Sequence, residues 1–161
     1  MRSPVAAIAR YTLLEALRNR LGWLLLFAMV LTVAGACFLA LVSLTEADAV
    51  RAAVVGSALR AEAVFLVALF VITTTVRELN DKGFEVLASL PIARAALLAG
   101  KLFGFAGVSL IIALLFGLVV WLFAPAVQAA IWTVSLLLEL LMVMALSVLC
   151  LLTFSQIPAA L

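Results

Sequence analysis

The chain has 161 residues, of which 69% are hydrophobic and 11% charged, with a formal net charge of +2. Ordinary soluble domains are about 45–50% apolar and about 25% charged, and a globule of this size cannot bury so much apolar surface, so the composition excludes a water-soluble fold. The small net charge gives no sign of a nucleic-acid partner, and the lack of His with only two Cys excludes imidazole catalysis, most metal sites and a disulfide framework.

The first predicted element is an amphipathic helix within residues 1–20. Ser3 and Pro4 provide a helix start signal. Four leucines then fall on one helical stripe opposite polar side chains: Leu13, Leu14, Leu17 and Leu21. We expect this helix to lie on the inner membrane surface before the first crossing. The alternative is a simple basic anchor that serves topology alone, and both place its arginines at the cytoplasmic face.

The first membrane helix is predicted over residues 21–44. Leu21–Thr45 is a run without charge, and crossing about 30 Å of hydrocarbon takes roughly 20 helical residues. The run is too long for the apolar core of a cleavable signal peptide, which is about 7–15 residues.

A second membrane helix is predicted over residues 56–76. Its charge-free core, Ala63–Val76, is short, but the preceding Ala52–Leu59 is also largely apolar. Arg60 and Glu62 separate the two stretches. We expect both charged side chains to lie near a helix end and to reach the headgroups by snorkelling.

The third and fourth membrane helices are predicted over residues 102–123 and 131–152. The stretch from Leu102 to Leu138 has no charge and is far too long for one crossing. Pro125 is the natural place for a break, because proline removes a backbone donor and disfavours helix in the preceding residue. The result is a tight hairpin, with Trp121 and Trp132 flanking the turn at matching depth as in an aromatic belt.

The basic residues orient the predicted helices. They cluster in the N-terminal tail and after the second helix: Arg2, Arg10, Arg18 and Arg20, then Arg77, Lys82, Arg94 and Lys101. The other side has only Arg51 and Arg60, offset by acidic neighbours. By the positive-inside rule, the N-terminus and residues 77–101 are predicted to be cytoplasmic and the turn at Pro125 external.

Residues 77–101 form a charged segment that also carries apolar side chains. Arg77 with Asp81 and Glu78 with Lys82 are spaced as helical pairs, and Pro91 starts another helix. A short charged and apolar helix facing the cytoplasm is a candidate docking surface for a soluble partner. The alternative is a structured loop that merely connects the second and third membrane helices.

The same segment resembles the cytoplasmic signature of the type-2, exporter-type ABC transporter permeases. The resemblance rests on residues in matching order and spacing: Arg77, Glu78, Gly83, Glu85, Leu87, Ser89-Leu90-Pro91-Ile92, Arg94, Leu97-Leu98 and Gly100-Lys101. Phe84 stands where the family often has Thr. The likeness extends to the N-terminal helix and the order of the four spans. The family domain typically has six membrane helices, so the last two are expected to be missing here.

The resemblance implies a permease half that pairs with a second copy or a related permease and docks a cytoplasmic coupling helix on a separate ATP-binding subunit. By this analogy the coupling contact uses five residues: Glu78, Asp81, Phe84, Glu85 and Leu87. The chain has no G-x-x-x-x-G-K-[ST] loop, so it is expected to be no enzyme itself, with ATP and Mg²⁺ on the partner and no cofactor of its own. The implied location is the bacterial inner membrane, with lipid as its surroundings and no nucleic acid.

Glu139 is the only charge in the last sixty residues and falls within the predicted fourth helix. A lone carboxylate at mid-membrane depth costs about 2.5–3.5 kcal/mol on insertion scales. One interpretation is a substrate-path or proton-coupled group. The other is a neutral packing residue hydrogen-bonded to Thr133, Ser135 or Ser147, because no basic partner is expected in any span.

The leading prediction is therefore the membrane subunit of an ATP-driven exporter. From a different functional class, the chain is a non-transporting membrane anchor or assembly factor that recruits a cytoplasmic partner through residues 77–101. An intramembrane enzyme is disfavoured, because one carboxylate without His or a paired nucleophile leaves little chemistry.

Overall fold

The computed structural model describes residues 4–18, 21–42, 47–80 and 94–155, and every element in these ranges is an α-helix. The five helices are α1 (Pro4–Arg18), α2 (Leu21–Val42), α3 (Ala47–Asn80), α5 (Arg94–Trp121) and α6 (Ala126–Ser155). The predicted all-α class is therefore confirmed.

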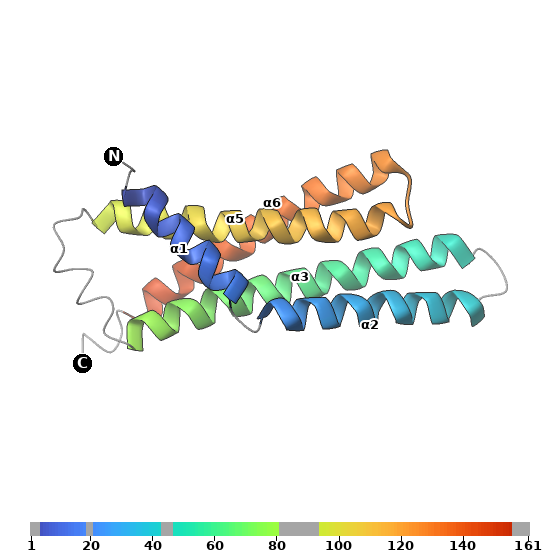
Figure 1. Cartoon of the computed structure of the whole chain (residues 1–161), viewed down its shortest axis with the longest axis horizontal. Helices are drawn as coiled ribbons and strands as arrows, with labels where there is room; N and C mark the ends of the chain where they lie inside the picture. The colour runs from blue at the N-terminus through green and yellow to red at the C-terminus, as the bar shows by residue number, and fades with distance from the viewer. Residues whose placement is uncertain (1–3, 19–20, 43–46, 81–93, 156–161) are drawn as a thin grey trace.

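Four of the helices run alongside one another in an elongated bundle, and α1 lies obliquely across it (Figure 1). α2 packs on α3, α6 packs on both α3 and α5, and α1 packs mainly on α5. The start of α1, the end of α3 and the start of α5 lie at one end of the bundle (Figure 1). The end of α2, the start of α3 and the α5–α6 turn lie at the other end.

Three helices are long and apolar enough to cross a membrane: Val50–Arg77, Leu98–Trp121 and Ala126–Leu151. They correspond to the second, third and fourth predicted spans. In α2 the apolar stretch among the described side chains, Trp23–Phe38, is shorter, so the first span stays a prediction.

The second span differs from its prediction in where it begins. The sequence predicts residues 56–76, whereas α3 is continuous over Ala47–Asn80. Arg60 and Glu62 therefore lie about three and a half turns or more into the helix, and their expected place near a helix end is wrong. Both side chains find polar partners on neighbouring helices, which removes the need to reach the headgroups.

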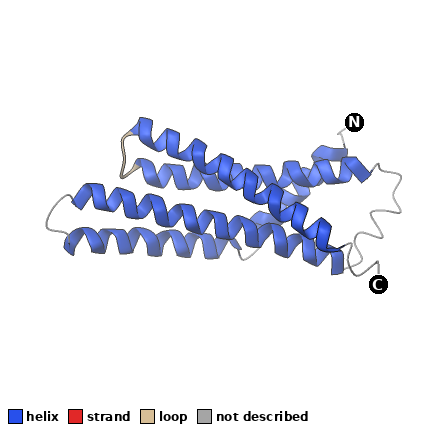
Figure 2. Ribbon diagram, turned by 180° about the vertical axis from the view of Figure 1, so that it is seen from behind, coloured by secondary structure: helices blue, strands red, loops and turns tan. Residues whose placement is uncertain are grey.

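The predicted break at Pro125 is confirmed. α5 ends at Trp121 and α6 begins at Ala126, so Pro125 directly precedes the first helical residue (Figure 2). The amides of Phe123 and Ala124 both donate to the carbonyl of Val120 at 3.0 Å and close the last turn of α5. The second helix of the hairpin begins five residues earlier than predicted, because proline is well tolerated at a helix start.

The buried core lies between α3, α5 and α6. Its largest fully buried side chains include Leu59 of α3, Phe105 and Phe116 of α5, and Leu136 of α6. Phe105 meets Phe70 of α3 edge to face, with the ring centroids 5.8 Å apart. These contacts hold α3, α5 and α6 against one another.

Glycines on α5 allow close helix approaches. A Cβ added at Gly104 would lie 2.7 Å from Cβ of Thr12 in α1, and one at Gly107 would lie 2.8 Å from a methyl carbon of Leu13. Thr12 is accordingly buried. Helix α1 thus packs on α5, while the amphipathic helix on the inner membrane surface that the sequence predicts for residues 1–20 stays a prediction.

Candidate functional site

A polar cluster joins α3 to α6 within their apolar stretches. Nε of Arg60 lies 3.3 Å from Oε2 of Glu139, and Nη2 of Arg60 donates a hydrogen bond to Oγ of Ser135 at 3.0 Å. Ser135 and Glu139 are four residues apart and share one face of α6, so a single guanidinium reaches both. The arginine fork supplies the several donors that such a two-partner contact needs.

Trp132 extends this cluster by one turn toward the α5–α6 turn. The guanidinium carbon of Arg60 lies 5.7 Å from the centroid of the Trp132 ring, within the range of a cation–π contact. Gly56, one turn before Arg60, also lies beside the indole, because a Cβ there would be 3.4 Å from Nε1 of Trp132, which is an ordinary contact distance. The arginine is thus held by a carboxylate, a hydroxyl and an aromatic face, all from α6.

A second polar contact joins α3 to α2. The Thr32 hydroxyl donates a hydrogen bond to Oε1 of Glu62, whose other carboxylate oxygen is buried with no hydrogen-bond partner among the described residues. Glu62 follows Arg60 by two residues and therefore projects from a different side of α3. Helix α3 is consequently linked by polar side chains to a helix on each side.

The depth of the cluster follows from helix geometry. Glu139 lies seven residues from Trp132, or about 10 Å along the helix axis. Half of the hydrocarbon core is about 15 Å thick. With Trp132 in the interfacial aromatic belt that the sequence predicts, Glu139 lies well inside the hydrocarbon, where a charge without a partner is unfavourable.

The structure corrects one expectation for Glu139. The sequence interpretation gave this carboxylate no basic partner in any span, and Arg60 is such a partner. Ser135 belongs to the site, but it binds Arg60, while Thr133 donates to the carbonyl of Ala129 at 2.7 Å. The missed signal was the presence of opposite charges within two apolar stretches of similar length.

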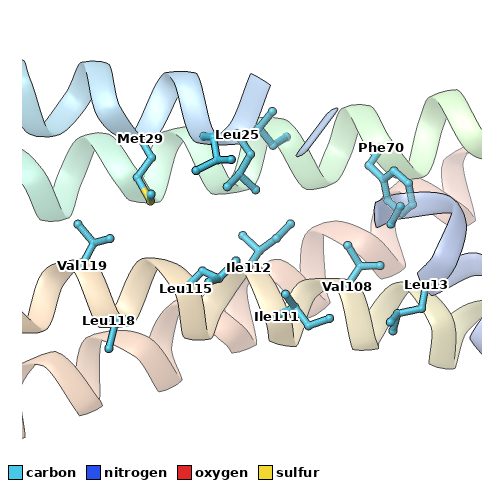
Figure 3. Close-up of a pocket in the computed structure, with 13 residues that line it drawn as sticks. Leu13, Leu25, Met29, Phe70, Val108, Ile111, Ile112, Leu115, Leu118 and Val119 are labelled. Carbon is cyan, nitrogen blue, oxygen red and sulfur yellow. The ribbon is translucent and has the colours of Figure 1, made fainter. Parts of the chain in front are cut away.

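An apolar cleft of about 430 Å³ lies between α2 and α5 (Figure 3). Leu25 and Met29 of α2 face Ile112 and Val119 of α5 across the gap, and Phe70 of α3 lies toward its α1 end. All its lining side chains are Leu, Ile, Val, Ala, Met or Phe. The volume is within the range of small-molecule sites, and the chemistry of the lining suits an apolar chain.

A second cavity, of about 520 Å³, lies between α3 and the α5–α6 turn. Its lining includes polar atoms of Ser57, Gln128 and Trp132. Because Trp132 lies against both this cavity and Arg60, the cavity borders the polar cluster.

The predicted coupling residues lie at the other end of the bundle or outside the described part. Glu78 is in the last turns of α3, and its side chain is not among those described. Asp81, Phe84, Glu85 and Leu87 fall outside the described residues. Their part in partner docking therefore stays a prediction.

Chemically, the described residues offer an ion pair within two apolar stretches, an apolar cleft, and a partly polar cavity next to the ion pair. No protein-family model, curated protein or solved structure matches the chain.

Proposed function

We propose that the chain is the permease subunit of an ATP-binding-cassette exporter in a bacterial inner membrane, moving its substrate with energy from a separate ATPase. The observation that carries the proposal is the common position of three elements. The end of α3 and the start of α5, which flank the charged segment, lie at the same end of the bundle as the start of α1 (Figure 1). A soluble ATPase docked at that end reaches both regions that the distribution of basic residues predicts to be cytoplasmic, the N-terminal residues 1–20 and the segment 77–101.

The proposed topology has four crossings, with α2 as the first. α2 has 22 residues, or about 33 Å at 1.5 Å per residue, which matches the hydrocarbon thickness. The basic side chains within residues 1–20 and 77–101 support a cytoplasmic position for the N-terminus and the coupling segment.

The interior features fit a transporter that changes shape. The apolar cleft separates α2 from α5, so α2 has room to move toward α5, while α3 is packed on α5 through Phe70 and Phe105. Force applied at the cytoplasmic end of α3 and α5 is transmitted along these long helices, as in rigid-body switching between inward and outward states. The proposed assembly contains two permease chains, which are two copies of this chain or a pair of related chains.

The test is co-purification from the native cells. The tagged wild-type chain is expected to retain an ATP-binding-cassette subunit after mild detergent extraction, identified by its own P-loop peptide. The combined Phe84→Ala and Glu85→Arg variant is expected to lose most of that subunit. Val127→Arg is the matched control, because Val127 is 74% exposed in the first turn of α6, at the opposite end of the bundle, and lines neither cavity. Equal retention by all three chains would reject the coupling role of residues 77–101.

A further inference from the structure

The Arg60–Glu139 pair is accessible from outside the bundle. The side chains of Arg60 and Glu139 are 36% and 41% exposed although both lie inside stretches apolar enough to span a membrane. Charged side chains at membrane depth face protein or water, because hydrocarbon solvates neither ion. The α3–α6 face that carries the pair therefore requires a cover that is not lipid.

The side chains beside the Arg60–Glu139 pair indicate that protein, and not water, covers this face. Met142 and Leu146 follow Glu139 by three and seven residues on the same side of α6, and they are 74% and 63% exposed. α6 is also the least buried of the three candidate spans. A patch in which large exposed apolar side chains continue from the charged pair along α6 suits a packed helix interface, whereas a water-filled path would favour polar neighbours.

We propose that a second copy of this chain docks on the α3–α6 face, with the Arg60–Glu139 pairs of the two chains meeting at the interface. Charge complementarity favours a second copy as the partner. A two-fold axis that passes between the two side chains applies the face to itself and brings each Arg60 near the Glu139 of the other chain. This inference rests on the pairing of permease chains in the proposed function, and its test does not involve the ATPase.

Cysteine cross-linking in membranes tests whether two copies of the chain meet at the α3–α6 face. Cys37 and Cys150, both exposed, are first replaced by Ala. Met142→Cys then reports on the α3–α6 face, and Leu114→Cys, 57% exposed on α5, is the control for an apolar position elsewhere. Mild oxidation is expected to give covalent dimers at position 142 and few at position 114.

Charge variants in the same background test the complementarity. Arg60→Glu makes both cluster positions acidic, and Glu139→Arg makes both basic. Each variant alone is expected to lose the dimer at position 142. Co-expressed with different tags, the two are expected to give the mixed dimer, because opposite charges then meet only between chains. If the single variants do not accumulate, the combined Arg60→Gln and Glu139→Gln variant is expected to reduce cross-linking several-fold.

Three outcomes would overturn the proposal. The first is equal cross-linking at positions 142 and 114, and the second is the absence of a mixed dimer when both charge variants are present in the membrane. The third is efficient labelling of Ser135→Cys by a membrane-impermeant maleimide, which would mean that water covers the pair. If the chain gives one of these results and still retains its ATPase subunit, the α3–α6 face is not the interface between copies, and the proposed function is unaffected.

Discussion

Nε of Arg60 in α3 lies 3.3 Å from Oε2 of Glu139 in α6. The contact pairs two helices that are separated in sequence by the whole of α5. It neutralises the charge that each helix carries inside an apolar stretch, and with the Ser135 hydrogen bond it fixes the depth of one helix against the other. The pair thus adds a directional polar contact to the apolar packing of α3 on α6.

Removing either member of the Arg60–Glu139 pair is expected to destabilise the protein, and removing both is expected to cost less than the sum of the two single losses. Arg60→Gln and Glu139→Gln each leave a charge without its partner, while the double variant leaves none. A double-mutant cycle on unfolding in detergent should give a coupling free energy of about 0.5–3 kcal/mol.

Arg10→Gln is the charge control for this cycle, because Arg10 is exposed on α1 and distant in sequence from both residues. It should change stability little in any background. Strict additivity of Arg60→Gln and Glu139→Gln would show that the two side chains do not interact in the folded protein.

The α5–α6 contact is expected to be intolerant of a methyl group at Gly117. A Cβ there would lie 2.8 Å from Cγ2 of Thr133, which is too close for ordinary contact. Gly117→Ala should therefore lower the free energy of unfolding by about 1–3 kcal/mol, as for other overpacked sites. Thr133→Ala removes the nearest atoms and should restore part of this loss.

Gly35→Ala provides the matched control for Gly117→Ala. A Cβ at Gly35 has no neighbour within 4 Å, and alanine is the better helix former by about 0.5–1 kcal/mol. Melting in detergent should show no loss for this variant. Similar destabilisation by both substitutions would contradict the packing of α5 on α6.

The packing of α1 against α5 is expected to depend on Gly104. The Cβ of Gly104→Ala would lie 2.7 Å from the Cβ of Thr12, so α1 must shift away. Limited proteolysis after Tyr11 or Arg18 should become faster than in the wild type, and Thr12→Gly should slow it again by removing the clash. A cleavage rate unchanged by Gly104→Ala would mean that α1 is not held against α5.

Reporter fusions are expected to place the two ends of the bundle on opposite sides of the membrane. Alkaline phosphatase, active only outside the cytoplasm, should be active when fused after Thr45 or Pro125 and inactive when fused after Gly83. Green fluorescent protein at the N-terminus should fluoresce. An inactive Thr45 fusion beside an active Pro125 fusion would remove α2 from the set of crossings.

Much of the fold was accessible from the sequence, because the spacing of charges and prolines determines where a membrane helix can begin and end. The break at Pro125 and three of the apolar spans follow from that spacing alone. The start of α3 could not be predicted in this way. From the sequence alone Arg60 and Glu62 are expected at the membrane interface, and only the structure shows their partners on α6 and α2.

The candidate site was less accessible than the fold. Glu139 was identified as a residue in need of an explanation, but its pairing with Arg60 depends on which helices are neighbours and at what register. The apolar cleft is likewise a product of helix arrangement, since Leu25 and Val119 look like ordinary membrane residues in sequence. Neither relationship is encoded by local spacing.

ATP hydrolysis in proteoliposomes tests the central claim most directly. The measurement compares the turnover of the co-purified ATPase alone, with the wild-type chain, with Val127→Arg, and with the combined Phe84→Ala and Glu85→Arg variant. The permease assignment predicts that the wild-type chain and Val127→Arg change turnover alike and that the combined variant leaves it at the level of the ATPase alone. Turnover that is the same with and without the wild-type chain would contradict the assignment and favour a membrane anchor that only recruits its partner.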